Sequence, residues 1–219
     1  MVKNIDIKVV SDTVCPWCYV GKQRMDKAIS EFQSFNPASP ITFTTTWYPF
    51  YLNPAAPKIG EDKNAMYARK FGEERMKMMR ARMLQIGEAE GINFKWGGKT
   101  GNTRDTHRLL QLGKSKSPEV QTRVVEELFK AYHENEQDPT SHEVLQKVGE
   151  DAGLDAKEVK EWLGSDKGGP LVDREVEEAQ RRYIQGVPHF TIQGKYELEG
   201  AQEPSAFLQI FKMLKDQDA

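Results

Sequence analysis

The feature that most constrains this chain is the segment Asp-Thr-Val-Cys-Pro-Trp-Cys at residues 12–18, which holds its only two cysteines. Apolar and polar residues alternate over 5–9, which predicts a β-strand just before the segment. Apolar residues recur at helical spacing over 20–32, which predicts a helix just after it. Pro16 suits the first position of a helix, where its missing N–H would have had no partner. We therefore expect Cys15 at the junction of a strand and a helix.

The position of the pair predicts its chemistry. A helix N-terminus carries partial positive charge and unpaired backbone N–H groups, and both favour a thiolate at Cys15. Cys18 lies one turn further along, where it can attack a mixed disulfide formed by Cys15. This indicates Cys15 as the nucleophile and Cys18 as the resolving thiol. Inert buried thiols and a metal site are weaker alternatives. Zinc needs about four ligands and the four histidines are scattered, so no metal is expected.

Composition and charge exclude several classes of function. The chain has 219 residues and a net charge of −2, which gives no basic surplus for nucleic acid or an anionic membrane. No apolar stretch has the length of a signal peptide or a membrane span. We therefore expect a cytoplasmic protein with no nucleic-acid or membrane partner. In a reducing compartment, a Cys-x-x-Cys pair is more often catalytic, redox-active or metal-binding than structural.

The rest of the chain predicts an α/β protein with a long helical middle. Residues 41–48 are rich in β-branched and aromatic side chains and indicate a second strand. Helical patterns follow at residues 61–90, 102–112, 118–133, 141–152, 155–163 and 171–184. Residues 186–192 and 196–198 indicate a hairpin, and residues 207–214 indicate a last helix.

Two segments leave alternatives open. Residues 48–54 form an apolar loop with aromatic rings and prolines, which is either a buried connection or one wall of a binding groove. The pattern of residues 61–90 favours packing of its methionines in the core, with an adaptable binding surface as the alternative. The methionines at this spacing are Met66, Met76, Met79 and Met83.

Four motifs in register resemble a known family. They are Cys15-Pro-Trp-Cys-Tyr-Val-Gly21, Gly101-Asn-Thr103 with His107-Arg108-Leu109, Gly186-Val-Pro188, and Glu199-Gly-Ala-Gln202. Together they resemble the FrnE-type branch of the DsbA-like thioredoxin-fold oxidoreductases over nearly the whole chain. The same superfamily includes 2-hydroxychromene-2-carboxylate isomerase and the kappa-class glutathione transferases, which usually carry serine at the position of Cys15.

The resemblance implies a fold and a domain organisation. The fold is α/β, a thioredoxin fold with a central four-stranded mixed sheet and a large inserted all-helical subdomain. Residues 1–60 and 166–219 would form the thioredoxin-like domain. Residues 61–165 would form the inserted helical subdomain.

The resemblance also implies roles around the cysteine pair. Cys15 would be the surface-exposed nucleophile and Cys18 the more buried partner. Pro16 and Trp17 would belong to the substrate-binding set, and residues between the cysteines also set the redox poise of the pair.

Further implied binding residues come from distant parts of the chain. Pro188 would be a cis-proline facing the cysteines, and the backbone of Val187 would pair with an extended peptide or with glutathione. Asn102, Thr103 and His107 would lie where the helical insertion faces the site. For His107, a purely structural role in its helix is an equal alternative.

The predicted function is a thiol–disulfide oxidoreductase acting on protein, peptide or glutathione disulfides. It would need no cofactor beyond the redox-active Cys15–Cys18 disulfide, with glutathione as the candidate co-substrate. The alternative is a glutathione-dependent isomerase or transferase acting on a small aromatic molecule, for which Cys18 is unnecessary. A third alternative is a binding module whose thiols act as a redox sensor. The protein is expected to be a monomer or a homodimer.

Overall fold

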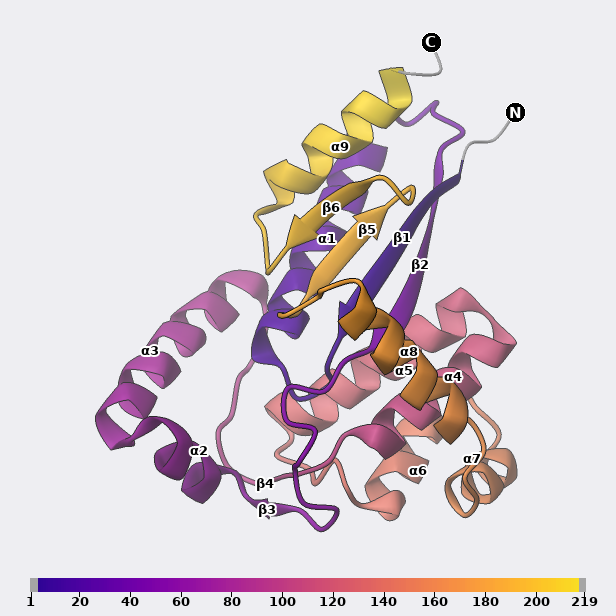
Figure 1. Cartoon of the computed structure of the whole chain (residues 1–219). Helices are drawn as coiled ribbons and strands as arrows, with labels where there is room; N and C mark the ends of the chain where they lie inside the picture. The colour runs from indigo at the N-terminus through magenta and orange to yellow at the C-terminus, as the bar shows by residue number, and fades with distance from the viewer. Residues whose placement is uncertain (1–3, 217–219) are drawn as a thin grey trace.

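A four-stranded mixed sheet forms the centre of the molecule in the computed structural model, which describes residues 4–216 (Figure 1). The strand order is β2–β1–β5–β6. The strands are β1 (Asn4–Ser11), β2 (Thr42–Pro49), β5 (His189–Ile192) and β6 (Tyr196–Glu199). β1 is parallel to β2 and antiparallel to β5, and β5 is antiparallel to β6. The predicted mixed sheet of four strands is confirmed.

Helices account for most of the remaining chain. They are α1 (Pro16–Phe35), α2 (Lys63–Phe71), α3 (Glu73–Glu90), α4 (Arg104–Lys116), α5 (Pro118–Phe129), α6 (His142–Asp151), α7 (Ala156–Leu163), α8 (Gly169–Arg181) and α9 (Pro204–Asp216). A π-helical turn, η1 (Lys130–Glu134), continues α5. A short ribbon pairs β3 (Glu61–Asp62) with β4 (Lys99–Thr100).

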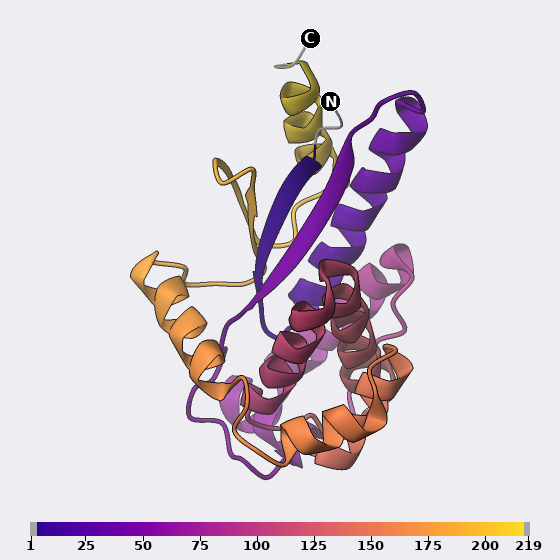
Figure 2. The same cartoon turned by 90° about the vertical axis from the view of Figure 1, so that its right-hand side faces the viewer.

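The sheet is covered differently on its two faces. Ile5, Ile7 and Val9 alternate along β1 and are buried in the main core with residues of α1 and α9, which pack together. Val10 points to the opposite face and packs in a smaller cluster with Ala179 of α8. Figure 2 shows α1 and α8 on opposite sides of β1 and β2. The period of two in the strand therefore decides which helix covers each side chain.

The helical insertion lies at one end of the sheet, and α2 and α3 extend from it as an arm beside the start of α1 (Figure 1). The insertion is tied to β2 through Gln121 of α5. The side chain of Gln121 accepts the N–H of Trp47 at 3.0 Å and donates to the carbonyl oxygen of Trp47 at 2.9 Å. An α/β fold with a helical insertion is thus confirmed, while the domain boundaries of 61–165 stay a prediction.

The helical pattern predicted over residues 61–90 is confirmed for most of the segment, but the structure divides it into two helices. The chain forms β3, then α2, and breaks at Gly72 before α3. Gly72 has φ 78°, a backbone conformation that glycine adopts without the steric cost of a side chain. The break lets the two helices take different directions around the cavity described below.

Candidate active site

The two cysteines lie where β1 gives way to α1. Cys15 is the N-cap residue of α1, with φ −86° and ψ 112°, and Pro16 occupies the first helical position. The backbone N–H of Cys15 donates to the carbonyl oxygen of Asp12 at 3.0 Å, and that of Cys18 donates to the carbonyl oxygen of Cys15 at 3.1 Å. Both thiols are free, and they lie close together. The predicted strand–cysteine–helix junction is confirmed.

A loop from the far end of the chain meets Cys15. The Cys15 thiol donates to the carbonyl oxygen of Val187 at 3.7 Å, and the Val187–Pro188 peptide bond is cis. The close approach depends on Gly21 of α1, because a Cβ at that position would lie 2.8 Å from Cγ of Pro188. The fold therefore brings together the first and third of the four sequence motifs.

The two thiols have different environments. Cys15 contributes to the wall of a cavity, whereas Cys18 is fully buried behind it. Burial raises the pKa of the Cys18 thiol well above its ordinary value. The hydrogen bond with Cys15 and the negative charge of the Cys15 thiolate raise the pKa of Cys18 further. Cys18 is therefore held as a thiol while it lies beside Cys15.

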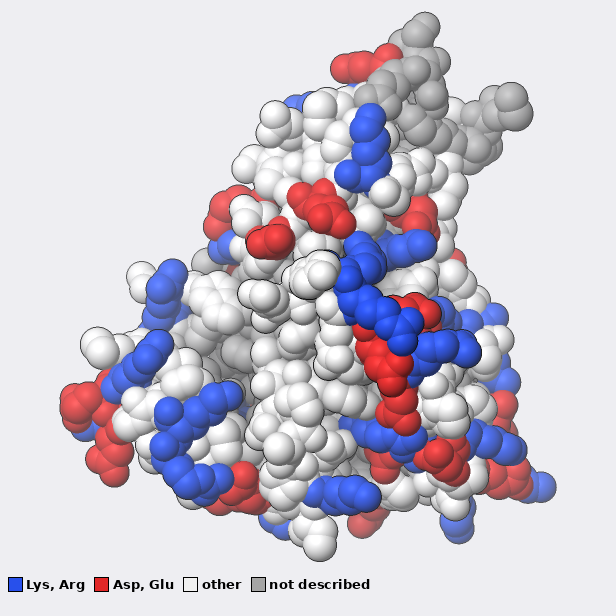
Figure 3. Space-filling model, in the orientation of Figure 1, with Lys and Arg blue, Asp and Glu red and all other residues white. Residues whose placement is uncertain are grey.

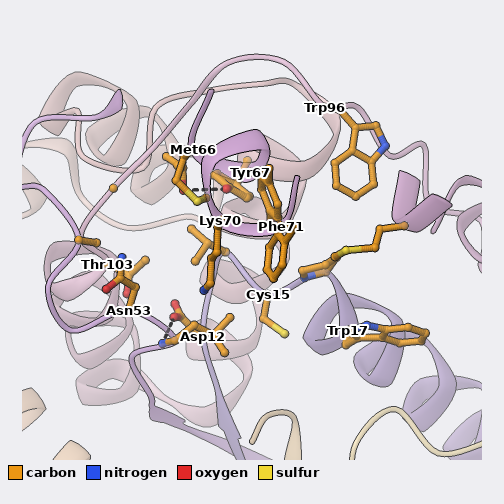
Figure 4. Close-up of a pocket in the computed structure, with 18 of the residues that line it drawn as sticks. Asp12, Cys15, Trp17, Asn53, Met66, Tyr67, Lys70, Phe71, Trp96 and Thr103 are labelled. Carbon is orange, nitrogen blue, oxygen red and sulfur yellow. Dashed lines mark hydrogen bonds between the residues drawn. The ribbon is translucent and has the colours of Figure 1, made fainter. Parts of the chain in front are cut away.

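A cavity of about 480 Å³ opens in front of Cys15 (Figure 4), within the range of small-molecule sites. The junction between β1 and α1 contributes Asp12, Val14, Cys15, Pro16 and Trp17. The arm of α2 and α3 contributes Met66, Tyr67, Lys70, Phe71, Arg75, Met79, Arg82 and Met83. The remaining wall includes Leu52, Asn53, Trp96, Thr100, Thr103, Tyr132 and Val187. The walls are mostly apolar and aromatic, with cationic side chains from the arm.

The predicted substrate-binding residues divide into two groups. Pro16, Trp17, Thr103 and Val187 line the cavity. Pro188, Asn102 and His107 lie outside its lining. The backbone N–H of Asn102 donates to the carbonyl oxygen of Pro57 at 2.9 Å, and its side-chain oxygen accepts the N–H of Arg104 at 2.9 Å, which helps to begin α4.

His107 is buried in α4, close to Asp12, which lines the cavity. Its Nε2 is 3.1 Å from the carbonyl oxygen of Phe50 and 3.7 Å from Oδ1 of Asp12. Asp12 is almost fully buried, and its Oδ2 accepts the N–H of Leu52 at 2.8 Å. A substrate-binding role of His107 stays a prediction, and its contacts also fit the structural alternative.

Two tyrosines that the sequence analysis did not single out line the cavity. Burial, followed by the negative charges of Cys15 and Asp12, raises the pKa of Tyr67 to about 12. Burial likewise raises the pKa of Tyr132, whose hydroxyl donates to Oγ1 of Thr100 at 2.9 Å. Both phenols therefore remain protonated near neutral pH.

The cationic side chains of the arm were also missed. Arg75, Met79 and Arg82 follow at intervals of four and three residues, which places them on one face of α3. This spacing was the available signal in the sequence, but it marks a shared face without showing what the face covers.

Two expectations about this region need correction. The favoured core role for the methionines is wrong for Met66 and Met79, which are only partly buried and line the cavity. Cys15 was expected to be surface-exposed, yet its exposed fraction is 4% because the Val187 loop lies against it.

The apolar segment 48–54, which begins at the end of β2, serves both of the roles left open for it. Tyr48 and Phe50 pack against the small cluster around Val10 on the sheet, whereas Leu52 and Asn53 line the cavity. The loop is therefore a packed connection over its first half and a wall of the cavity over its second half.

Two general properties of the described chain bear on the site. None of the helices within residues 4–216 combines the length and apolar character needed to cross a membrane. In the same part of the chain, no group of three or more His, Cys, Asp or Glu side chains is arranged to hold a metal ion.

A sheet of this order, with paired cysteines at the start of α1 and a cis-proline loop against them, defines a protein of the thioredoxin-like class. The model of the DSBA-like thioredoxin domain family matches residues 6–212. The chain therefore belongs to the DSBA-like thioredoxin domain family, and the resemblance carried by the four motifs is confirmed.

Solved structures agree with this assignment. A probable DsbA oxidoreductase from Streptomyces coelicolor is 27% identical, with a TM-score of 0.79 over 95% of this chain and 89% of that one. A 2-hydroxychromene-2-carboxylate isomerase is 16% identical, with a TM-score of 0.69 over 97% of both chains. The cytosolic disulfide reductase DsbM from Pseudomonas aeruginosa, determined with GSH, is 13% identical, with a TM-score of 0.65 over 96% of this chain and 99% of that one. The last two are less than 25% identical to this chain, so they show a shared fold.

Proposed function

We propose that this protein is a thiol–disulfide oxidoreductase that reduces disulfide substrates through Cys15 and Cys18. The observation that carries the proposal is the asymmetry of the pair. Cys15 caps α1 and opens onto a cavity, while Cys18 is buried behind it with a raised pKa. An attacking thiol needs access to substrate, and a resolving thiol needs access only to its partner.

The proposed reaction has two exchange steps. The Cys15 thiolate attacks one sulfur of the substrate RS–SR′, which forms Cys15–S–S–R and releases R′S⁻. Cys18 then attacks the Cys15 sulfur, and its proton passes to the leaving RS⁻, so that RSH and the Cys15–Cys18 disulfide are formed. The substrate gains two electrons and the cysteine pair loses two. Two equivalents of an external thiol, for which glutathione is the candidate, reduce the Cys15–Cys18 disulfide to the dithiol and are themselves oxidised to a disulfide.

The cavity supports substrate binding beside the nucleophile. Trp17 and Val187 both line it and provide an aromatic surface and a backbone edge. One protein of similar fold is named as a cytosolic disulfide reductase and was determined with GSH, which supports a cytoplasmic, glutathione-coupled role here as part of the proposal.

The test is a titration of the protein across a series of glutathione redox ratios, with alkylation and mass measurement of the thiols. We expect one two-electron transition to an intramolecular Cys15–Cys18 disulfide. The Cys18→Ser variant should instead accumulate a single mixed disulfide on Cys15, because the resolving thiol is missing. The Cys15→Ser variant should lose disulfide reduction, and full activity in that variant would exclude the proposal.

A second candidate is a glutathione-dependent isomerase or transferase acting on a small aromatic molecule. It is favoured by the aromatic cavity walls and by the shared fold of the isomerase. In the same titration, it predicts a persistent glutathione adduct or complex at Cys15 in the wild type and no intramolecular disulfide. Turnover would then survive in the Cys18→Ser variant.

A further inference from the structure

Two arginines of α3 face the cavity without an acidic partner. Arg75 and Arg82 both line it, and their spacing of seven residues places them about 10 Å apart along one face of the helix. Within residues 4–216, no ion pair or hydrogen bond engages either guanidinium group. Each has five N–H donors in a planar fork, the geometry that binds carboxylates in pairs of hydrogen bonds.

Aromatic rings of the cavity hold both guanidinium groups at its rim. Arg75 lies 5.8 Å from the ring centre of Phe71, and Arg82 lies 5.7 Å from that of Trp17. Contacts of this kind position a guanidinium group beside apolar surface while its N–H groups stay available. Trp17 is two residues after Cys15 in the cysteine motif. Its contact with Arg82 therefore places this arginine in the same part of the cavity as the reacting thiol.

The acidic residues of the cavity have other partners. Glu61 accepts a hydrogen bond from Nη2 of Arg69 at 2.7 Å. Asp12 lies on the cavity floor, where its carboxylate is 3.7 Å from His107, and the Lys70 side chain extends toward it (Figure 4). The charge left over in the cavity is therefore positive, and it comes from Lys70 and from Arg75 and Arg82 at the rim. Figure 3 shows Lys and Arg side chains gathered over α2 and α3, beside a hollow in the surface.

We propose that Arg75 and Arg82 select anionic substrates, namely disulfides whose apolar or aromatic body carries carboxylate groups. This inference rests on the proposed function, because a disulfide is what Cys15 would attack. The apolar walls take the body of the substrate, and the two arginines bind its carboxylates at the rim. The two residues are specificity determinants, since they contact the substrate away from the sulfur atoms.

The test compares two aromatic disulfides of similar size and different charge. The dianionic one is 2,2′-dithiodibenzoate, and the neutral one is 2,2′-dithiodipyridine. The kcat/KM of each is measured for the wild type, for the Arg75→Gln/Arg82→Gln double variant, and for the control Lys77→Gln. Lys77 is on the same helix but outside the cavity lining, where it pairs with Glu74. The ratio of variant to wild type is taken for each substrate, because the two leaving groups differ in intrinsic reactivity.

We expect the double variant to lose about tenfold or more in kcat/KM with the dianion, the size of one charge-assisted hydrogen bond. Its kcat/KM with the neutral disulfide should stay within about twofold, as should both substrates with Lys77→Gln. Raising the salt concentration about tenfold should reduce the wild-type kcat/KM for the dianion and leave that for the neutral disulfide unchanged. Equal losses with both substrates, or no loss with the dianion, would overturn the inference.

A binding measurement separates this inference from the proposed function. If the wild type reduces neither disulfide, the proposed function fails, and selectivity is then read from binding alone. The Cys15→Ser/Cys18→Ser protein is titrated with each disulfide, with and without the two arginine substitutions, and binding is followed by isothermal titration calorimetry. Weaker binding of the dianion alone in the arginine-substituted protein supports the inference. Identical affinities overturn it.

Discussion

At the scale of single residues, burial decides which side chains change protonation within the working range of pH. Cys15 and Cys18 are one helical turn apart. Cys15 lines the cavity, whereas Cys18 is removed from it, and burial raises the pKa of the Cys18 thiol. His133, in the π-helical turn, shows the same effect on a base. Burial, and then the positive charge of Lys63, lowers the pKa of His133 to about 3.

The lowered pKa of His133 predicts that the folded protein loses stability in mild acid. The unfolded chain binds a proton on His133 below its ordinary pKa of 6.5, whereas the folded protein does not until about 3. The free energy of unfolding should therefore fall as the pH drops below 6.5, by about 2 kcal/mol at pH 5 from this residue, at about 1.36 kcal/mol for each pH unit.

The measurement is urea unfolding of the wild type and a His133→Phe variant at pH 7 and pH 5. Phenylalanine keeps a ring between Tyr19 and Phe94, which both contact the imidazole. The variant should lose about 2 kcal/mol less than the wild type between the two values of pH. An equal loss in both proteins would show that His133 is not the group that titrates.

At the scale of the elements, the site depends on one close contact between α1 and the loop before β5. Gly21 lies in α1, and a Cβ there would lie 2.8 Å from Cγ of Pro188 and 3.2 Å from Cζ of Phe190. The contact sets how near the Val187 carbonyl comes to the Cys15 thiol.

We expect Gly21→Ala to destabilise the protein by about 1–2 kcal/mol. Overpacking costs about 1–3 kcal/mol, and the better helix propensity of alanine offsets up to about 1 kcal/mol of it. The variant should also reduce disulfides more slowly, because Val187 is displaced from Cys15. Gly186→Ala is the stability control, since no atom lies within 4 Å of a Cβ there. Chemical unfolding of both variants measures the difference, and equal stabilities would contradict the argument.

The same elements show what the sequence could and could not predict. The strand–cysteine–helix junction was predictable because its signals are local, from the alternation before Cys15 to the proline after it. The cavity wall on α2 and α3 was not, because helical spacing identifies a face and says nothing of its neighbour. Met79 and Arg82 share such a face, and only the path of the chain after Gly72 brings that face over Cys15.

At the scale of the whole molecule, a small ion cluster joins the arm to α1, the helix that packs on the thioredoxin-like sheet. Glu90, the last residue of α3, accepts a hydrogen bond from Nε of Arg24 at 2.7 Å and one from Nζ of Lys27 at 2.6 Å. Both cations are on α1. Although burial acts in the opposite direction, these contacts lower the pKa of Glu90 below its ordinary value. The cluster therefore fixes the end of α3 to the helix that begins with the cysteines.

Glu90→Gln should loosen the arm without damaging the cysteine pair. We expect faster amide hydrogen exchange across α3, because one of its attachments to α1 is weakened. Reduction of 2,2′-dithiodibenzoate should fall more than that of 2,2′-dithiodipyridine, since Arg75 and Arg82 move with the helix. Glu88→Gln, an exposed neighbour on α3, is the control for the loss of charge. Unchanged exchange in Glu90→Gln would show that the ion cluster does not hold the arm.

The contact between Cys15 and Val187 also has a consequence during translation. The two residues are 172 positions apart in the chain. A ribosome adds about 5–20 residues each second, so the covering loop is made roughly 10–30 s after the cysteines. During that interval both thiols are present on a nascent chain that lacks the segment that shields them. A newly made chain therefore leaves accessible, for that interval, two thiols that the finished fold buries.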